Sequence, residues 1–192
     1  MGKIVVSQNV SLDGVVEDPT GEDGFRHGGW FEQFMGEDRA AWASVELDEA
    51  RRAQALLLGR RTDAYFGPRW STATGEWADR LNSLPKYVVS STLNQPQWTN
   101  VTILKGDAVT EVSDLKRRID GEIVVYASRQ LVQTLMERDL VDELRLTVFP
   151  VVLGAGQRLF GDTPDKMPLR LINSQTIGGG LLHLTYEHVA AA

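Results

Sequence analysis

The chain of 192 residues contains no cysteine, so it can form neither a disulfide nor a thiolate zinc site. Its three histidines leave little for a histidine-built metal site, and we predict no metal. No apolar run reaches the ~18 residues that a membrane-spanning helix needs. Residues 1–20 lack the basic start and apolar core of a signal peptide, because Asp13, Glu17 and Asp18 interrupt the candidate stretch. These absences favour a cytoplasmic protein with no membrane contact.

Positive charge is also scarce, since 20 Lys and Arg stand against 26 Asp and Glu, a net charge of −6. A nonspecific nucleic-acid binder usually carries the opposite sign, so we expect no nucleic-acid partner. The hydrophobic share of 42% and the charged share of 24% are those of an ordinary globular protein and exclude a disordered chain. No repeat or linker divides the sequence, and we therefore expect a single domain over residues 1–192.

Short apolar runs alternate with segments of helical periodicity. The runs predict strands at residues 3–7, 55–58, 86–90, 101–104, 122–126, 144–152 (interrupted by Pro150), 169–177 and 181–189. The periodic segments predict helices at 38–53, 60–66, 112–119 and 129–136. The alternation in the middle of the chain indicates parallel crossovers, whereas the three glycines at 178–180 indicate a C-terminal hairpin. We therefore expect an α/β fold with one mixed, mostly parallel sheet and antiparallel C-terminal strands.

One candidate binding segment is the strand-to-helix junction formed by Gly59, Arg60, Arg61 and Thr62. A helix N-terminus presents unpaired N–H groups, and a guanidinium can bind a phosphate through two hydrogen bonds. The junction therefore suits a phosphate. The same letters also describe a helix that begins with two solvated arginines.

Two further junctions carry groups that suit an anion. Ser90 and Ser91 end a strand, and residues 125–131, which include Ala127, Ser128 and Leu131, again lead from a strand into a helix. Serine is also a common residue at strand ends and a common helix cap, so each junction alone has an ordinary structural explanation. Taken together, three such junctions favour a nucleotide lying across the strand ends.

Four motifs, in this order along the chain, resemble a known family. They are Ser11-Leu12-Asp13-Gly14, Leu58-Gly59-Arg60-Arg61-Thr62, Val141-Asp142-Glu143-Leu144 and the run Pro150-Val151-Val152-Leu153-Gly154-Ala155-Gly156-Gln157-Arg158-Leu159-Phe160. Together they resemble the dihydrofolate-reductase-like family, nearest the C-terminal reductase domain of the bifunctional riboflavin-biosynthesis deaminase-reductase and its stand-alone relatives. The resemblance extends from Lys3 to about Val189.

The resemblance implies a three-layer α/β/α fold and an NADPH-dependent reductase, often a homodimer that pairs through its late strands. By the same resemblance, Arg60, beside Arg61, would hold the adenosine 2′-phosphate, and Thr62 the pyrophosphate. Ser90 and Ser91 would lie by the adenosine ribose, and Ala127 and Ser128 by the pyrophosphate and nicotinamide. Gly59 and Leu131 complete the expected cofactor contacts. Thr147 matches a strand threonine that holds the pteridine ring in dihydrofolate reductases.

The sequence departs from the family pattern in two places. Ala127-Ser128 replaces Gly-Gly or Gly-Ser, where glycine permits close backbone approach. The carboxylates on the first long helix, Glu46, Asp48 and Glu49, lack the surrounding dihydrofolate motif, so we expect them to be solvated. Asp13 is then the candidate catalytic residue, as a group that orients substrate or relays a proton. Asp-Gly is also a common turn, and that alternative stays open.

Aromatic residues gather between Phe25 and Phe34, and Trp30 is a candidate to stack on a flat substrate. Aromatic residues also simply fill cores. Trp70 and Trp77 are expected in a loop. Because the chain has no cysteine and no H-x-E motif, zinc-dependent deamination is excluded. We therefore predict an NADPH-dependent reductase of the riboflavin-biosynthesis type that transfers hydride to a small pterin-like or pyrimidine-like heterocycle. A non-catalytic nucleotide-binding module on the same fold is the alternative.

Overall fold

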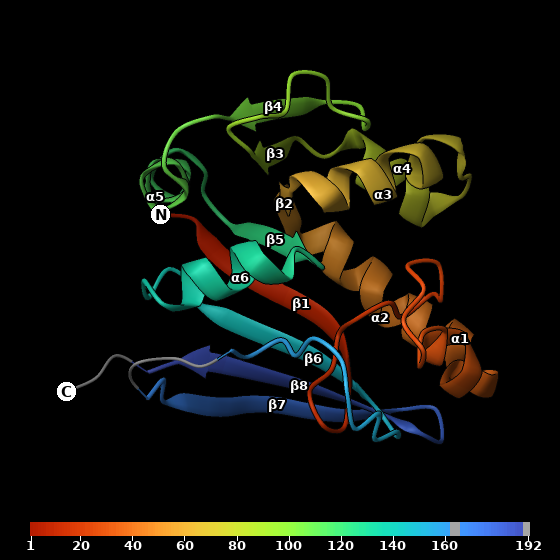
Figure 1. Cartoon of the computed structure of the whole chain (residues 1–192). Helices are drawn as coiled ribbons and strands as arrows, with labels where there is room; N and C mark the ends of the chain where they lie inside the picture. The colour runs from red at the N-terminus through yellow and green to blue at the C-terminus, as the bar shows by residue number, and fades with distance from the viewer. Residues whose placement is uncertain (162–165, 190–192) are drawn as a thin grey trace. The chain divides into compact units, whose positions relative to one another are not determined.

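The computed structural model describes residues 1–161 and 166–189 (Figure 1). Its eight strands form one sheet in the order β4-β3-β2-β5-β1-β6-β8-β7. The strands are β1 Lys3–Ser11, β2 Ala53–Gly59, β3 Lys86–Val89, β4 Val101–Leu104, β5 Glu122–Tyr126, β6 Glu143–Phe149, β7 Leu169–Ile177 and β8 Leu181–His188. This mixed sheet confirms the predicted α/β fold class.

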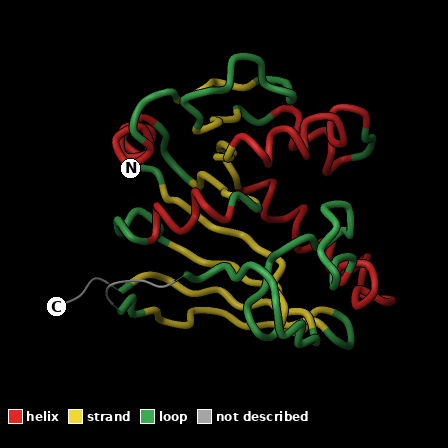
Figure 2. Tube along the Cα trace, in the orientation of Figure 1, coloured by secondary structure: helices red, strands yellow, loops and turns green. Residues whose placement is uncertain are grey.

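Figure 2 shows the helices in red. They are α1 Trp30–Met35, a 3₁₀ turn η1 Gly36–Asp38, α2 Arg39–Arg52, α3 Arg60–Thr72, α4 Glu76–Ser83, α5 Ala108–Arg118 and α6 Arg129–Met136. No helix among the described residues is long and apolar enough to cross a membrane.

The chain divides into two compact units. The first comprises Met1–Val6 and Glu46–Asp142, and the second comprises Ser7–Val45 and Glu143–Ala192. The expectation of a single domain over residues 1–192 stays a prediction, and residues 162–165 and 190–192 lie outside the described part of the chain.

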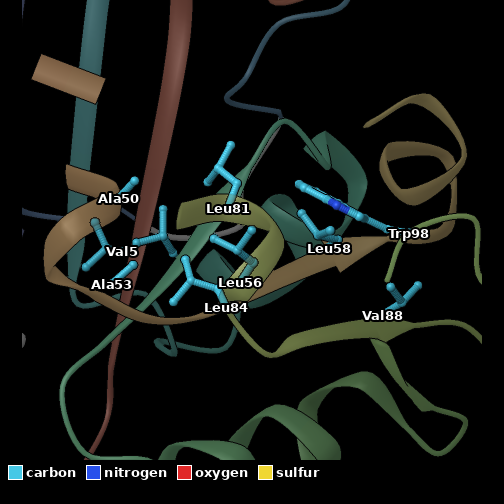
Figure 3. Packing of buried hydrophobic residues seen from close by; sticks show 10 residues of the cluster. Val5, Ala50, Ala53, Leu56, Leu58, Leu81, Leu84, Val88 and Trp98 are labelled. Carbon is cyan, nitrogen blue, oxygen red and sulfur yellow. The ribbon is translucent and has the colours of Figure 1, made fainter. Parts of the chain in front are cut away.

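The first unit contains the parallel strands. β2 pairs with β3 on one side and with β5 on the other, and β3 pairs with β4. The side chains of Leu56, Leu57 and Leu58 are fully buried, as expected for a continuous apolar run in a sheet covered on both faces. Figure 3 shows Leu56 and Leu58 of β2 in one cluster with Leu81 and Leu84, which lie in and just after α4.

The second unit contains the antiparallel strands. β8 pairs with β6 and with β7, and a turn at residues 178–180 joins β7 to β8, which confirms the predicted hairpin. Gly178 has φ +57°, and a Cβ there would overlap the Asp38 carboxylate. That carboxylate accepts hydrogen bonds from the N–H groups of Gly179 and Gly180 at 2.9 and 3.0 Å. Gly178 is therefore required both by the positive φ of the turn and by its close approach to Asp38.

One sequence-based expectation for the first unit is wrong. Trp70 and Trp77 lie in α3 and α4 rather than in a loop, and their rings pack edge to face. The helix predicted to start over Arg60 to Phe66 is α3, which continues past Pro68 to Thr72, and α4 has a buried stripe at Ala78 and Leu81. The strand predicted over 144–152, with an interruption at Pro150, ends at Phe149 just before that proline, which cannot donate to a ladder hydrogen bond.

Candidate functional site

In the first unit, β2 delivers Gly59 to the start of α3, a helix of 13 residues. Arg60 and Arg61 occupy the first two helical positions and are exposed, whereas Thr62 is buried. No side chain caps this helix. The junction therefore offers free guanidinium groups beside a helix N-terminus, where the helix dipole and the backbone N–H groups favour an anion.

Ser128, at the start of α6, connects this junction to the end of β5. The Gly59 N–H donates to Ser128 Oγ at 2.9 Å. Ser128 Oγ lies 2.9 Å from Thr62 Oγ1, and the Ser128 N–H donates to the same Thr62 oxygen at 3.2 Å. Ser128 makes no side-chain cap hydrogen bond to α6, so ordinary capping does not explain this serine. The structure thus brings together three of the predicted cofactor-binding residues.

Ala127 and Ser128 both adopt left-handed backbone conformations, with φ of 49° and 53°. Two successive non-glycine residues in this region are uncommon, and each costs of order 1–2 kcal/mol. No peptide bond among residues 1–161 and 166–189 is cis. Ala127 and Ser128, which stand where the family has Gly-Gly or Gly-Ser, therefore still form the tight turn, at a cost that surrounding contacts must offset.

Ser90 orders the turn after β3. Its Oγ accepts hydrogen bonds from the N–H groups of Thr92 and Leu93 at 3.3 and 3.0 Å. These bonds support the strand-end interpretation of Ser90, and they fix the backbone beside Ser91, which is exposed. Leu131 lies on the inner face of α6 and is buried, so its side chain contributes to the packing of this helix.

Asp63 could not be singled out from the sequence. It follows Thr62 in α3, is fully buried, and accepts hydrogen bonds from the N–H groups of Gln97 and Trp98 at 2.8 and 3.2 Å. A Cβ on Gly67, one turn further along α3, would overlap the Gln97 carbonyl. Asp63 and Gly67 together hold the segment that follows β3 against α3. Asp63 stands among polar residues at the start of a helix, so no hydrophobic periodicity in the sequence marks it as buried.

In the second unit, Asp13 joins the turn after β1 to the glycine-rich loop after β6. Its carboxylate accepts hydrogen bonds from the N–H groups of Leu153 and Gly154 at 3.1 and 2.9 Å and from Ser11 Oγ at 2.8 Å. Arg158 lies 3.6 Å from the same carboxylate. Burial alone would raise the pKa of Asp13, but the hydrogen bonds from Leu153, Ser11 and Gly154 outweigh it and lower the pKa to about 2. Asp13 is therefore ionised at neutral pH.

The two neighbouring carboxylates act in a similar way. Glu17 accepts a hydrogen bond from the Gln157 N–H at 2.7 Å and so adds a second link to the glycine-rich loop. Asp18 is buried and accepts from the N–H groups of Glu22, Asp23 and Phe25. Burial opposes ionisation of Asp18, yet these backbone donors lower its pKa. The loop after β1 is thus organised by three carboxylates.

Trp30 and Thr147, the predicted substrate-binding residues, are both buried. The Trp30 ring packs edge to face on Phe149, and its indole N–H donates to the Glu17 carbonyl at 2.9 Å. This packing supports the alternative in which the aromatic residues fill the core. Thr147 Oγ1 lies 3.0 Å from His183 Nδ1, its register partner on β8.

The expectation that the carboxylates on α2 are solvated is wrong for two of the three. Glu46 and Glu49 are only 6% and 3% exposed, because they share a stripe at helical spacing with the buried Ala50. Asp48 faces away from that stripe and forms an exposed ion pair with Arg51 at 2.8 Å, as expected for a solvated residue.

Comparison with known proteins identifies the family. The chain matches the RibD C-terminal domain family over residues 2–183. It belongs to that family. The uncharacterized protein YyaP of Bacillus subtilis (strain 168) is 27% identical over 96% of this chain and 94% of its own length.

Among solved structures, a putative riboflavin biosynthesis protein from Shewanella sp. PV-4 superposes with a TM-score of 0.76 at 24% identity, covering 98% of this chain and 99% of the other. Dihydrofolate reductase from Enterococcus faecalis, in a complex with NADP(H), superposes with a TM-score of 0.61 at 13% identity, over 97% and 96% of the two chains. The predicted resemblance is therefore confirmed, and the fold is dihydrofolate-reductase-like. Because the family consists of reductase domains, the chain is reductase-like.

Proposed function

We propose that the protein is an NADPH-dependent reductase that transfers hydride to a small pterin-like or pyrimidine-like heterocycle. The observation that carries the proposal is the cluster of Gly59, Thr62 and Ser128 at the ends of β2 and β5, with two exposed arginines at the start of α3. Ligands of open α/β sheets bind beyond such strand ends. Membership of the RibD C-terminal domain family supports a reductase rather than another nucleotide-dependent class.

The residues of the first unit fit a phosphorylated dinucleotide. Arg60 and Arg61 are exposed, and a guanidinium fork matches a phosphate monoester such as the adenosine 2′-phosphate. Thr62 and Ser128 lie at the N-termini of α3 and α6, which suits the pyrophosphate. Gly59, Ser90, Ser91, Ala127 and Leu131 complete the proposed cofactor contacts and their support. When bound, NADPH supplies the hydride.

Residues of the second unit carry the proposed substrate contacts. The ionised Asp13 orders the loop at residues 11–17, and Thr147 offers a hydroxyl whose rotamer His183 fixes. The proton that accompanies hydride transfer then comes from water, because a carboxyl group with a pKa of about 2 is not protonated at neutral pH. The protein's own contribution is to orient the reactants and to exclude bulk water. We assign no stacking role to Trp30.

The alternative is a non-catalytic nucleotide-binding module, and the strained turn at Ala127 favours it, since a methyl group there crowds the approach of a cofactor. The buried Glu46 and Glu49 favour the enzyme, because a carboxylate on this helix is what the dihydrofolate-type substrate site requires. The proposal includes a cytoplasmic location, which the absence of cysteine supports.

The test is NADPH oxidation, followed by absorbance, against a panel of dihydropterins and phosphoribosylaminopyrimidines. Binding of NADPH is measured in parallel by the quenching of tryptophan fluorescence. Turnover of any panel member supports the reductase, and we expect Glu46→Gln or Glu49→Gln to slow it. Clear NADPH binding without turnover of any panel member would favour the binding module, and absence of NADPH binding would contradict both.

A further inference from the structure

One face of the three strands β6, β8 and β7 carries a polar row in a buried position. Thr147 of β6 and Gln175 of β7 are the register partners of His183 on β8. Thr147 and His183 are only 2% and 6% exposed, whereas Gln175 is exposed on the edge strand. The next row toward the hairpin is apolar, since Leu181 and Ile177 are register partners there and are both buried. Thr147 and His183 thus form a polar pair beside positions that hold packing residues.

The stability of the fold does not require a polar pair here. Phe149 follows Thr147 by two residues on the same face of β6, and the rings of Trp30 and Phe31 pack on it. This apolar cover would suit two apolar side chains as well, because replacing both partners of a buried hydrogen bond by apolar groups of the same shape is nearly neutral. A buried polar pair in this setting therefore points to recognition.

The hydrogen bond between the two side chains determines what Thr147 can offer a ligand. Thr147 Oγ1 and His183 Nδ1 lie 3.0 Å apart. A hydroxyl has one proton and two acceptor lone pairs, and a neutral imidazole has one donor nitrogen and one acceptor nitrogen. Within residues 1–161 and 166–189, Thr147 Oγ1 has no hydrogen-bond partner besides this nitrogen.

The lack of a second partner favours one direction for this bond. If His183 Nδ1 accepts, the Thr147 proton is paired and only oxygen lone pairs stay open. If Nδ1 donates, the Thr147 proton is left without an acceptor in a buried position, and unpaired buried donors are rarer than unpaired acceptors. The imidazole nitrogen therefore accepts the hydroxyl proton.

We propose that His183 is a positioning residue that sets substrate specificity by taking the Thr147 hydroxyl proton. With its proton committed, Thr147 can only accept a hydrogen bond from the substrate. It then favours a heterocycle that presents an amino or ring N–H group at this position and disfavours one that presents a carbonyl oxygen. This inference rests on the proposed function, because it assumes that the substrate contacts Thr147.

The test compares ligands that differ in one exocyclic group. Pterin carries an amino group where lumazine carries an oxo group, and isocytosine and uracil differ in the same way. The Kd of each compound is measured by fluorescence titration or calorimetry, without NADPH. We expect the wild type to bind the amino member of a pair about tenfold more tightly than the oxo member, because the oxo group would meet only lone pairs.

The decisive variant is His183→Leu, which returns the Thr147 proton to the ligand. The hydroxyl can then donate to a carbonyl oxygen, so the tenfold preference should fall to about twofold or less. His183→Asn provides an amide oxygen that can accept the same proton and should keep the preference. Thr147→Val should abolish it, and the Thr147→Val/His183→Leu double variant should discriminate no less than Thr147→Val alone, because the two groups act as a unit.

Thr185→Val is the matched control, since Thr185 is a buried hydroxyl residue on the same face of β8 in the adjacent row, opposite Arg145. It should leave the preference unchanged. Urea denaturation verifies that each variant is folded. A preference that His183→Leu leaves intact would overturn this inference, as would a wild type that binds both members of a pair equally, and the proposed function would stand. A wild type that binds no member of either pair would overturn both.

Discussion

The Asp13 carboxylate accepts a 2.9 Å hydrogen bond from the Gly154 N–H, although 141 positions separate the two residues in the chain. The neighbouring Leu153 N–H donates to the other carboxylate oxygen. One side chain thus satisfies two consecutive backbone donors of the glycine-rich loop and holds that loop to the turn after β1. This arrangement explains why a carboxylate rather than an amide stands at position 13.

The first prediction concerns Asp13→Asn. An asparagine offers one acceptor oxygen and one NH2 group, so one of the two loop N–H groups would face another donor. We expect the free energy of unfolding to fall by about 1–3 kcal/mol, the cost of an unsatisfied donor, as measured by urea denaturation. The control Asp48→Asn removes an exposed charge paired with Arg51 and should change stability by less than about 1 kcal/mol. Equal stability of Asp13→Asn and the wild type would contradict the role assigned to Asp13.

The second prediction follows from the pKa of Asp13, about 2 in the folded protein against ~3.9 in an unfolded chain. Because the folded-state pKa is the lower one, the carboxylate stabilises the fold at pH values above about 4, and this contribution is lost as the pH falls from 4 towards 2. The full difference corresponds to about 2–3 kcal/mol. Denaturation series at pH 2–6 should therefore show a shallower acid decline in Asp13→Asn than in the wild type. If the stability of Asp13→Asn and of the wild type fell equally with falling pH, Asp13 would not be a main contributor to the acid sensitivity.

Most strands were predictable from sequence because they are short apolar runs whose length matches a buried strand, whereas β7 is exposed along most of its length and was marked by the glycines of the hairpin. The bounds of β5, Glu122–Tyr126, agree with the prediction, and those of β2 differ by two residues at its start and one at its end. Helix α4 escaped prediction because only Ala78 and Leu81 mark its buried stripe, and the residues around it are polar.

The site was predictable in part, for a different physical reason. Sequence could mark the junctions at Gly59–Thr62 and at Ala127–Ser128, because each places hydroxyl or cationic groups at a helix start. It could not show that the two junctions touch, since that contact depends on β2 and β5 being neighbours in the sheet. In the same way, nothing local to Asp13 reveals a partner in a loop 140 residues away. The burial of Glu46 depends on tertiary packing, which overrides the general preference of charged residues for solvent.

The third prediction tests cofactor choice through Arg60. If its guanidinium binds the 2′-phosphate, NADPH should raise the melting temperature more than NADH does at equal concentration, because tighter binding to the native state stabilises it further. Arg60→Ala should remove most of that difference. Arg117→Ala, an exposed arginine in the last turn of α5, serves as the matched control and should preserve it. Identical melting-temperature shifts with NADPH and NADH in the wild type would contradict the assignment of Arg60 to the 2′-phosphate.

The fourth prediction concerns assembly. β7 is the last strand in the sheet order, and Leu169, Leu171 and Leu182 of the β7–β8 pair are exposed and share one face. An exposed apolar edge strand is prone to pair with another chain. We expect light scattering to give a mass near twice 21.3 kDa, and Leu171→Lys to reduce it to that of one chain. Val152→Lys, which alters an exposed apolar residue of the loop after β6, should leave the mass unchanged. A wild-type monomer at all concentrations would refute this prediction.

The fifth prediction concerns Lys86, whose side chain is only 1% exposed at the start of β3. Its ammonium group donates to the carbonyls of Asn82 and Leu84 at 3.1 and 2.9 Å and lies 4.6 Å from the centre of the Trp98 ring. These contacts satisfy the donors, but burial still lowers the pKa of Lys86 to about 8.

In an unfolded chain the pKa of a lysine is ~10.4, so between pH 8 and about 10 the unfolded state binds more protons than the folded state. Stability linked to Lys86 therefore rises with pH across this window and is lowest below pH 8, where both states carry the charge. Lys86→Met keeps the length and the apolar contacts of the side chain while it removes the titrating group. The difference in the free energy of unfolding between Lys86→Met and the wild type should shift in favour of the wild type as the pH rises from 8 to 10, as measured by urea denaturation. A difference that does not change with pH would show that Lys86 titrates as an ordinary lysine.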